Sequence, residues 1–334
     1  MVMKSAYEYN IELMQKVKPS MSYKGENFLQ WQKEARAKLI ELIGLDRFEK
    51  TEPLLEIEYE QKIENATEIR FTFASEEGYR VPCHLWLPDG IENPPVIICL
   101  QGHSTGMHIS MGRPKYEGDE ETIKGGDRDF CVRAIKEGYA AIAMEQRNFG
   151  ECGTKPGGTD CLYSKLIASL FGRTTIGERL WDLQRLIDVL ESDFANKVDV
   201  SKICLMGNSG GGTATAYAAA LEDRIVLAAP SCAMCTYRDS IGAMPHCACN
   251  FVPHIAEYFD MGDLLAMSYP KYFVQINGET DSIFPIAGAK EVFEKGQAAY
   301  RDMGKAENCV HVVGPEGHRF YADLSWPVFH KLVK

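Results

Sequence analysis

The sequence has no long apolar segment and no excess of positive charge. Its longest apolar runs, such as 96–100 and 139–144, are far too short to cross a bilayer, which takes about 20 residues. The 36 Lys and Arg residues are outnumbered by 47 Asp and Glu residues, so the formal net charge is −11. Because an acidic surface repels phosphate backbones, we expect neither a nucleic-acid nor a membrane partner.

An export signal and a disulfide pattern are also missing. Glu8 and Glu12 fall where a signal peptide would need its apolar stretch. The 11 cysteines have irregular spacing, so we expect buried, reduced thiols and a cytoplasmic location. A chain of 334 residues that is 45% hydrophobic and 25% charged is typical of a globular protein with one or two domains.

Residues 1–50 are predicted to form an N-terminal helical extension. One apolar face recurs there at helical spacing, and it consists of Phe28, Trp31, Ala35, Leu39 and Leu42. Gly44 supplies a stop signal after this face. The alternating segments 67–73 and 80–87 then predict antiparallel strands, which begin a second unit that covers residues 51–334.

Short, continuously apolar strands alternate with helices in this second unit. The predicted strands are 96–100, 140–144, 203–206, 225–229, 272–276 and 309–313. The predicted helices are 128–137, 176–190, 211–221 and 286–300. Thr175 and Glu178 match a capping box at the start of the second helix. This alternation predicts an α/β fold with a mostly parallel central sheet flanked by helices, and segment 231–270, which has no clear strand, is predicted to form a cap or lid.

The run Gly207-Asn208-Ser209-Gly210-Gly211 lies between a predicted buried strand and a helix of small residues. Gly-x-Ser-x-Gly in this position is typical of a nucleophile elbow, where a sharp strand-to-helix turn lifts the serine hydroxyl out of the sheet. Glycines flank the serine because side chains there would collide with neighbouring strands. The following helix aims backbone N–H groups at the hydroxyl. Ser209 is therefore the candidate nucleophile.

A serine nucleophile needs a base and an orienting acid, and the chain supplies both downstream. Asp281 and His318 each follow one of the last two predicted strands. The order Ser209, Asp281, His318 is that of the α/β-hydrolase triad, and the carboxyl ends of the strands would bring the three together. Glu279 is a rival for the acid and Glu145 a more remote one.

An oxyanion hole needs two N–H donors, one of which comes from the residue after the nucleophile. A flexible turn after the first strand of the alternating series contains His103. We therefore predict the backbone N–H groups of Gly210 and His103 as the donors. A role of the His103 side chain as a base is the alternative.

These residues resemble the α/β-hydrolase superfamily over about residues 50–334, and within it the acetyl xylan esterase and dienelactone-hydrolase-like branch. The segments that carry the resemblance are 101–103, 145–150, 181–182, 199–203, 207–212, 277–285 and 317–318. Gln101, Glu145 and Asn148 depart from that branch, which more often has His-Gly-x and Asp-x-Arg-Gly-x-Gly. Dienelactone hydrolases usually use cysteine, so Ser209 argues against that activity. The resemblance implies hydrolysis of carboxylic esters, such as acetyl groups on sugars.

Four further residues are predicted to contact the substrate, and they are Arg147, Asn148, Tyr237 and Arg238. The first two could instead hold their loop in place. We predict no metal and no other cofactor. Cys232-x2-Cys235 followed by Cys247-x-Cys249 suggests zinc, but Cys-x-Cys is an unusual second half, and whether these four cysteines bind metal is left open.

The function predicted from the sequence is that of a serine hydrolase that cleaves an ester of a small molecule or an oligosaccharide. Three alternatives share the elbow or the fold: a serine peptidase of the prolyl-oligopeptidase type, an acyltransferase, and a catalytically silent binding module. The N-terminal helices could pack on the same chain or on a second copy, so a homo-oligomer is compatible with the sequence.

Overall fold

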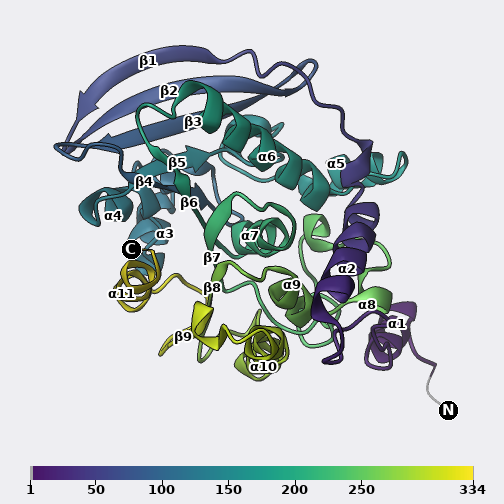
Figure 1. Ribbon diagram of the computed structural model, residues 1–334. Helices are drawn as coiled ribbons and strands as arrows, with labels where there is room; N and C mark the ends of the chain where they lie inside the picture. Colours follow the sequence, from purple (N-terminus) through teal and green to yellow (C-terminus); the bar gives the residue numbers. More distant parts are fainter. Residues whose placement is uncertain (1–2, 334) are drawn as a thin grey trace.

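The computed structural model describes residues 3–333, and a single twisted sheet runs through the centre of this region (Figure 1). Its nine strands have the order β1-β2-β3-β5-β4-β6-β7-β8-β9. From β5 to β9 in this order every neighbouring pair is parallel, whereas β1, β2, β3 and β5 pair antiparallel. The mostly parallel sheet predicted from the sequence is confirmed.

Each strand predicted from the sequence is present. The bounds are β1 Glu56–Ile63, β2 Ala66–Glu76, β3 Tyr79–Pro88, β4 Pro95–Leu100, β5 Ala140–Met144, β6 Asp199–Asn208, β7 Ile225–Ser231, β8 Tyr272–Gly278 and β9 Cys309–Gly314. Strand β1 was not predicted, because it is an edge strand whose side chains are almost all exposed. It therefore lacks the apolar pattern of a buried strand.

Helices cover both faces of the sheet (Figure 1). Their bounds are α1 Ala6–Met14, α2 Phe28–Ile43, α3 Asp119–Gly126, α4 Phe130–Lys136, α5 Cys161–Ser169, α6 Thr175–Asp193, α7 Gly210–Leu221, α8 Ile255–Tyr258, α9 Met261–Met267, α10 Ile286–Asp302 and α11 Ala322–Leu332. One face of the sheet forms the larger hydrophobic core together with helices α2, α6, α7 and α9. The other face packs against helices α4 and α11. Among residues 3–333, no helix is long and apolar enough to span a bilayer.

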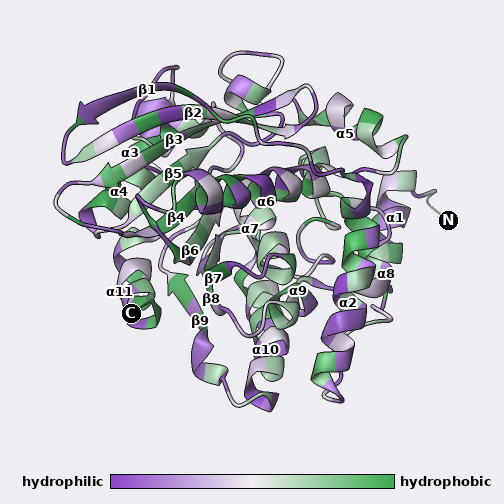
Figure 2. Cartoon of the chain, turned by 45° about the horizontal axis from the view of Figure 1, so that its top comes forward, coloured by the Kyte–Doolittle hydropathy of each residue, from purple (hydrophilic) through white to green (hydrophobic). Residues whose placement is uncertain are grey.

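Strand β4 shows how the continuous apolar runs produce this layered arrangement. Val96, Ile98 and Leu100 are buried in the core on one side of the sheet, while Ile97 and Cys99 are buried in the core on the other. Figure 2 shows the central strands largely in green, whereas α2 and α6 alternate between green and purple. A strand covered on both faces needs apolar residues at every position, whereas a helix needs them on one side only.

Helix α2 belongs to the core of the protein and is more than an appended extension. Ala35, Leu39 and Ile43 are fully buried in the larger core. The helix ends at Gly44, which has a φ of 70° and occupies the predicted stop position. The expected capping box of α6 is wrong by one residue: the cap is Thr174, whose hydroxyl accepts from the N–H of Gly177 at 3.0 Å.

Segment 231–270 contains the short helices α8 and α9. Every residue of α9 is buried, and Leu264 and Leu265 belong to the larger core. This end of the segment is therefore part of the body of the domain. The role of the preceding part as a lid stays a prediction.

Gly44 offers a test of how tightly α2 packs on the loop between α5 and α6. A Cβ at Gly44 would lie 2.2 Å from the carbonyl oxygen of Gly172, whereas a Cβ at Gly90, with a nearly identical φ of 71°, would meet nothing within 4 Å. We expect Gly90→Ala to lower the free energy of unfolding by about 1 kcal/mol through the backbone alone. Gly44→Ala should lower it by about 3 kcal/mol, because overpacking adds to the same backbone cost. Urea unfolding of both variants measures the difference, and equal losses would contradict the close contact.

Candidate active site

Ser209 occupies the sharp turn between β6 and α7. Its φ of 54° and ψ of −121° are unusual for a residue with a side chain, so the turn stores strain that its surroundings must hold. The Ser209 N–H donates to the carbonyl of Ser231 at 2.8 Å, and the Ser209 carbonyl accepts from the N–H of Thr213 at 2.8 Å. The backbone is thus fixed on both sides of the half-buried hydroxyl.

Glycines make this turn sterically feasible. A Cβ at Gly207 would lie 2.4 Å from the carbonyl oxygen of Gly211, and a Cβ at Gly211 would lie 2.2 Å from that of Leu100. A Cβ at Gly102 would lie 2.8 Å from Cβ of Ser209. Backbone therefore packs directly on backbone around the serine, as expected of a nucleophile elbow.

Asp281 and His318 form a hydrogen-bonded pair at the carboxyl ends of β8 and β9. Asp281 Oδ2 lies 2.8 Å from His318 Nδ1. The other carboxylate oxygen accepts from the N–H groups of Ile283 at 2.8 Å and Phe284 at 3.1 Å. This partner assigns the proton to Nδ1 and leaves Nε2 of the imidazole free to act as a base.

The surroundings keep Asp281 ionised. Burial favours its neutral form, but the hydrogen bond and charge of His318 and the two backbone donors outweigh burial, so the pKa of Asp281 is lowered. The two rival acids have other partners. Glu279 is exposed and lies 3.8 Å from Nζ of Lys290, while Glu145 accepts from backbone N–H groups at 3.1–3.2 Å.

The loop that carries His318 is linked to the strand beside the elbow. The hydroxyl of Ser231, at the end of β7, donates to Asn208 Oδ1 at 3.0 Å and lies 3.5 Å from the carbonyl oxygen of Arg319. Within residues 3–333, no hydrogen bond joins the Ser209 hydroxyl to the His318 imidazole. Catalytic hydrogen bonds of this kind are often long without substrate and shorten in the complex.

Cys232 is a neighbour of this pair that the sequence did not assign to it. Its Sγ, a carboxylate oxygen of Asp281 and a ring nitrogen of His318 all lie within 4.8 Å of one another. Burial and the charge of Asp281 raise the pKa of Cys232 to about 12, so it is a neutral thiol at physiological pH. It donates to the carbonyl of Arg319 at 3.2 Å and thus helps to hold the loop that carries His318.

The structure leaves the two predicted oxyanion donors available. Among the described residues, the N–H groups of His103 and Gly210 donate to no protein acceptor. The loop before His103 is fixed by Gln101, whose side-chain amide donates to Ser110 Oγ at 2.7 Å and to the carbonyl of Arg128 at 2.8 Å. The roles of both donors in catalysis stay predictions.

The imidazole of His103 packs against the elbow and faces a cysteine. A Cβ at Gly210 would lie 2.8 Å from both Cε1 and Nδ1 of the ring, so only glycine fits beside it. Nε2 of His103 lies 3.1 Å from Sγ of Cys249.

The cysteines considered as one zinc set do not come together. Cys232 lies beside Asp281, and Cys235 donates to the carbonyl of Pro285 at 3.5 Å. Cys247 and Cys249 instead cluster with His103 and Cys161. Short spacing in the sequence indicated the wrong partners, because the loop between Cys235 and Cys247 carries the two pairs to different neighbours.

Arg147 is surrounded by carboxylates. Its guanidinium donates to both oxygens of Asp182 at 2.8 Å and to Glu76 at 2.7 Å, and it lies 3.7 Å from Glu178. Asn148 has a φ of 72°, and its backbone N–H donates to the carbonyl of Cys152 at 3.2 Å. These contacts fit the structural alternative for both residues, and their contact with substrate stays a prediction.

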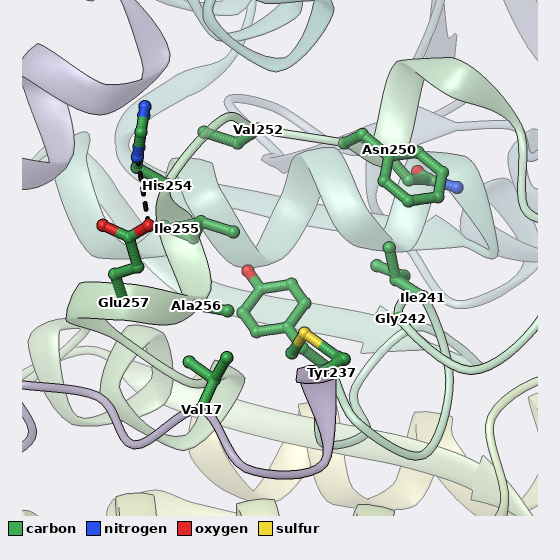
Figure 3. A pocket seen from close by; sticks show the side chains of 12 residues that line it. Val17, Tyr237, Ile241, Gly242, Asn250, Val252, His254, Ile255, Ala256 and Glu257 are labelled. Atoms are coloured by element: carbon green, nitrogen blue, oxygen red, sulfur yellow. Dashed lines mark hydrogen bonds and ion pairs between the residues drawn. The ribbon is translucent and has the colours of Figure 1, made fainter. Parts of the chain in front are cut away.

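Tyr237 lines a cavity of about 260 Å³ on the side of α1. Figure 3 shows its ring facing the apolar side chains of Val17 and Ile255. Its hydroxyl lies 2.7 Å from that of Tyr217. The lining of this cavity contains none of the triad candidates.

Arg238, the neighbour of Tyr237, pairs with Glu291 and lies 3.5 Å from Asp239. Substrate contact by Tyr237 and Arg238 therefore stays a prediction that their surroundings do not support.

A polar cavity of about 330 Å³ adjoins the predicted oxyanion loop. It is lined by His103, Ser104, Thr105, Glu117, Gly118, Asp119, Thr122, Gly157, Gly158 and Thr159. Asp119 fixes its wall, because it accepts from Thr105 Oγ1 at 2.6 Å and faces His108 Nε2 at 2.8 Å. No sequence pattern indicated this cavity, since its residues come from three separate segments, one of which includes the start of α3.

The parallel sheet, the serine at a strand-to-helix turn and the acid–histidine pair after later strands define an α/β-hydrolase fold. Comparisons with known proteins agree with this class. A family model described as "Glucuronyl esterase, fungi" matches residues 87–235. The inferred hydrolase YtaP of Bacillus subtilis is 24% identical over 247 residues, which cover 72% of this chain and 78% of that protein.

Two solved structures resemble the whole chain. One is a Bacteroides fragilis protein with an inferred acetyl xylan esterase assignment. It matches this chain with a TM-score of 0.81 at 15% identity, and the match covers 99% of this chain and 96% of that protein. A glucuronoyl esterase from Solibacter usitatus has a TM-score of 0.67 at 16% identity, with 96% and 98% covered. At such low identity these likenesses show the fold.

The geometry of the elbow predicts selective reaction of Ser209 with an electrophile. We expect a fluorophosphonate probe to label the wild-type protein on Ser209, because an activated serine attacks phosphorus as it attacks a carbonyl. Ser209→Ala should abolish the labelling, and Ser201→Ala, at an exposed serine on the same strand, should leave it unchanged. Peptide mapping by mass spectrometry reads out the site, and undiminished labelling of Ser209→Ala would contradict the assignment.

Proposed function

We propose that this protein is a serine esterase that cleaves carboxylic esters of carbohydrates through an acyl-enzyme. The observation that carries the proposal is the pair formed by the buried Asp281 and the partly exposed His318, with 2.8 Å between Oδ2 and Nδ1. The pair lies at the same carboxyl end of the parallel strands as the strained Ser209. A hydroxyl, a carboxylate and an imidazole in this chain order match the hydrolase triad.

The proposed reaction begins when Nε2 of His318 takes the proton from the Ser209 hydroxyl, which attacks the ester carbonyl. The backbone N–H groups of Gly210 and His103 stabilise the resulting oxyanion. Asp281 holds the imidazole in position and stabilises its charged form. The alcohol leaves with the proton from His318. In the second half of the reaction His318 takes a proton from water, which attacks the acyl-enzyme, and then returns the proton to Ser209 as the acid leaves.

A carbohydrate ester is the substrate class that the surroundings and the comparisons support. The cavity beside His103 offers hydroxyl groups and the carboxylate of Glu117, which suit sugar hydroxyls. The matched family model covers residues 87–235, which include both predicted oxyanion donors and Ser209. The Bacteroides fragilis protein, with its inferred acetyl xylan esterase assignment, favours an acetylated sugar, for which the carbohydrate is the leaving alcohol.

A uronoyl ester is the second candidate, favoured by the same family match. In such an ester the sugar acid is the acyl group, so the carbohydrate would remain on Ser209 in the acyl-enzyme. The two candidates therefore differ in which half of the substrate the enzyme must recognise. The predicted cytoplasmic location belongs to this proposal as well.

Steady-state kinetics on acetylated xylose and on an alkyl ester of glucuronic acid tests the proposal. We expect turnover of at least one of them by the wild type, and a fall in kcat/KM of about 10⁴-fold or more in Ser209→Ala. Asp281→Asn should lose about 10³–10⁴-fold, because it leaves the imidazole in the wrong tautomer. The acetate is expected to be the better substrate.

Equal rates for wild type and Ser209→Ala would contradict the serine mechanism. Cleavage of peptide amides without ester hydrolysis would favour a peptidase. Glu279→Gln serves as the control for Asp281→Asn, since its carboxyl is exposed and pairs only loosely with Lys290.

A further inference from the structure

Four potential metal ligands from three distant segments meet beside the elbow. They are His103 in the loop after β4, Cys161 at the start of α5, and Cys247 and Cys249 around a short 3-10 turn at Ala248–Asn250. Each offers a nitrogen or sulfur atom, and these four atoms all lie within 4.8 Å of one another. Nε2 of His103 is 3.1 Å from Sγ of Cys249 and 3.9 Å from Sγ of Cys161.

These separations suit a tetrahedral metal ion. Zinc binds sulfur at about 2.3 Å and nitrogen at about 2.0–2.1 Å, so its ligand atoms in a tetrahedron lie about 3.4–3.8 Å apart. Three cysteines and one histidine form a closed set, typical of a structural site with no open position for substrate. The four residues are all at least partly buried, and the three cysteines are free thiols.

A buried arginine supplies an independent argument from charge. Arg179 is 1% exposed, and its two terminal nitrogens lie 3.7 Å from Sγ of Cys249 and 3.8 Å from Sγ of Cys161. Within residues 3–333, Arg179 forms no ion pair with a carboxylate, and its other hydrogen bond is to the carbonyl of Arg147 at 3.1 Å. A buried cation needs a counter-charge. Zinc with three thiolates and one imidazole carries a net charge of −1, which Arg179 would neutralise.

We propose that His103, Cys161, Cys247 and Cys249 bind one structural zinc ion. The ion joins the loop after β4, the start of α5 and the segment that contains the 3-10 turn. Only Cys247 and Cys249 are close to each other in the sequence, so the site forms only when the tertiary fold brings His103 and Cys161 to them.

The zinc ion has a positioning role if the proposed function is correct. His103 would bind the metal through its side chain while its backbone N–H serves the oxyanion, and its ring is packed beside Gly210. The metal would therefore fix the position of the His103 N–H relative to the Gly210 N–H. This role rests on the proposed function, whereas metal binding itself does not.

Metal content tests the site directly. The full chain is purified with a reductant, titrated with Zn²⁺ against a chromophoric chelator, and analysed by mass spectrometry for bound metal. We expect one zinc ion per chain with a nanomolar dissociation constant or tighter. Cys161→Ser and Cys249→Ser should lose this high-affinity binding, whereas Cys152→Ser, at a partly buried cysteine outside the cluster, should retain it.

Cobalt keeps the test independent of whether the variants fold. Wild type loaded with Co²⁺ should show the visible absorption of a tetrahedral ion and the charge-transfer absorption of thiolate ligands. Wild type that binds well under one ion per chain, or Co²⁺ with an octahedral spectrum, would overturn the proposal. So would a disulfide between two of the cluster cysteines in protein isolated with its thiols blocked on lysis.

Ser209→Ala separates this proposal from the esterase. It should lack esterase activity and retain one zinc ion per chain. A wild type that binds zinc but hydrolyses no ester would refute the proposed function alone, and an active esterase that binds no zinc would refute the metal site alone.

Discussion

The candidate site depends on direct backbone contact between the end of β4 and the start of α7. A Cβ at Gly211 would lie 2.2 Å from the carbonyl oxygen of Leu100, so this contact exists only because the residue has no side chain. It sets how closely α7 approaches the sheet. The close approach in turn forces Ser209 into its strained conformation and brings the loop that carries His103 beside Gly210.

The rest of the site follows from the parallel sheet. Strands β6, β7, β8 and β9 are adjacent and parallel, so the segments after them emerge at one edge. Asp281 and His318 meet there, and Cys232 and Ser231 link the His318 loop to the strand between. Burial of the carboxylate is offset by three donors, which keeps it charged and keeps Nδ1 of the imidazole occupied.

The sequence carried enough information for the sheet and for the acid–histidine pair. Strands β4, β5 and β8 are almost fully buried, so their apolar runs are clear, and Asp281 follows β8 closely. His318 follows β9, an edge strand that is only partly buried but keeps enough apolar residues to be recognised. Strand β1 was missed because an exposed edge strand has no such requirement.

Sequence patterns did not predict the contacts between segments that are distant in the chain. Cys247 and Cys249 looked like partners of Cys232 and Cys235, but the fold pairs them with His103 and Cys161. Spacing indicates a metal site only when the ligands are neighbours along the chain. Arg147 likewise gave no sequence sign that Asp182 and Glu76 would bind its guanidinium.

A crystal structure of the protein covalently modified by a phosphonate ester mimic would show whether Ser209, His318 and the two N–H donors surround one reacting centre. We expect phosphorus bonded to Ser209 Oγ and a phosphonate oxygen that accepts from the N–H groups of Gly210 and His103. Nε2 of His318 should lie within about 2.6–3.2 Å of Ser209 Oγ or the leaving-group oxygen. An adduct in which the imidazole faces away from Ser209, or one formed on another residue, would contradict this expectation.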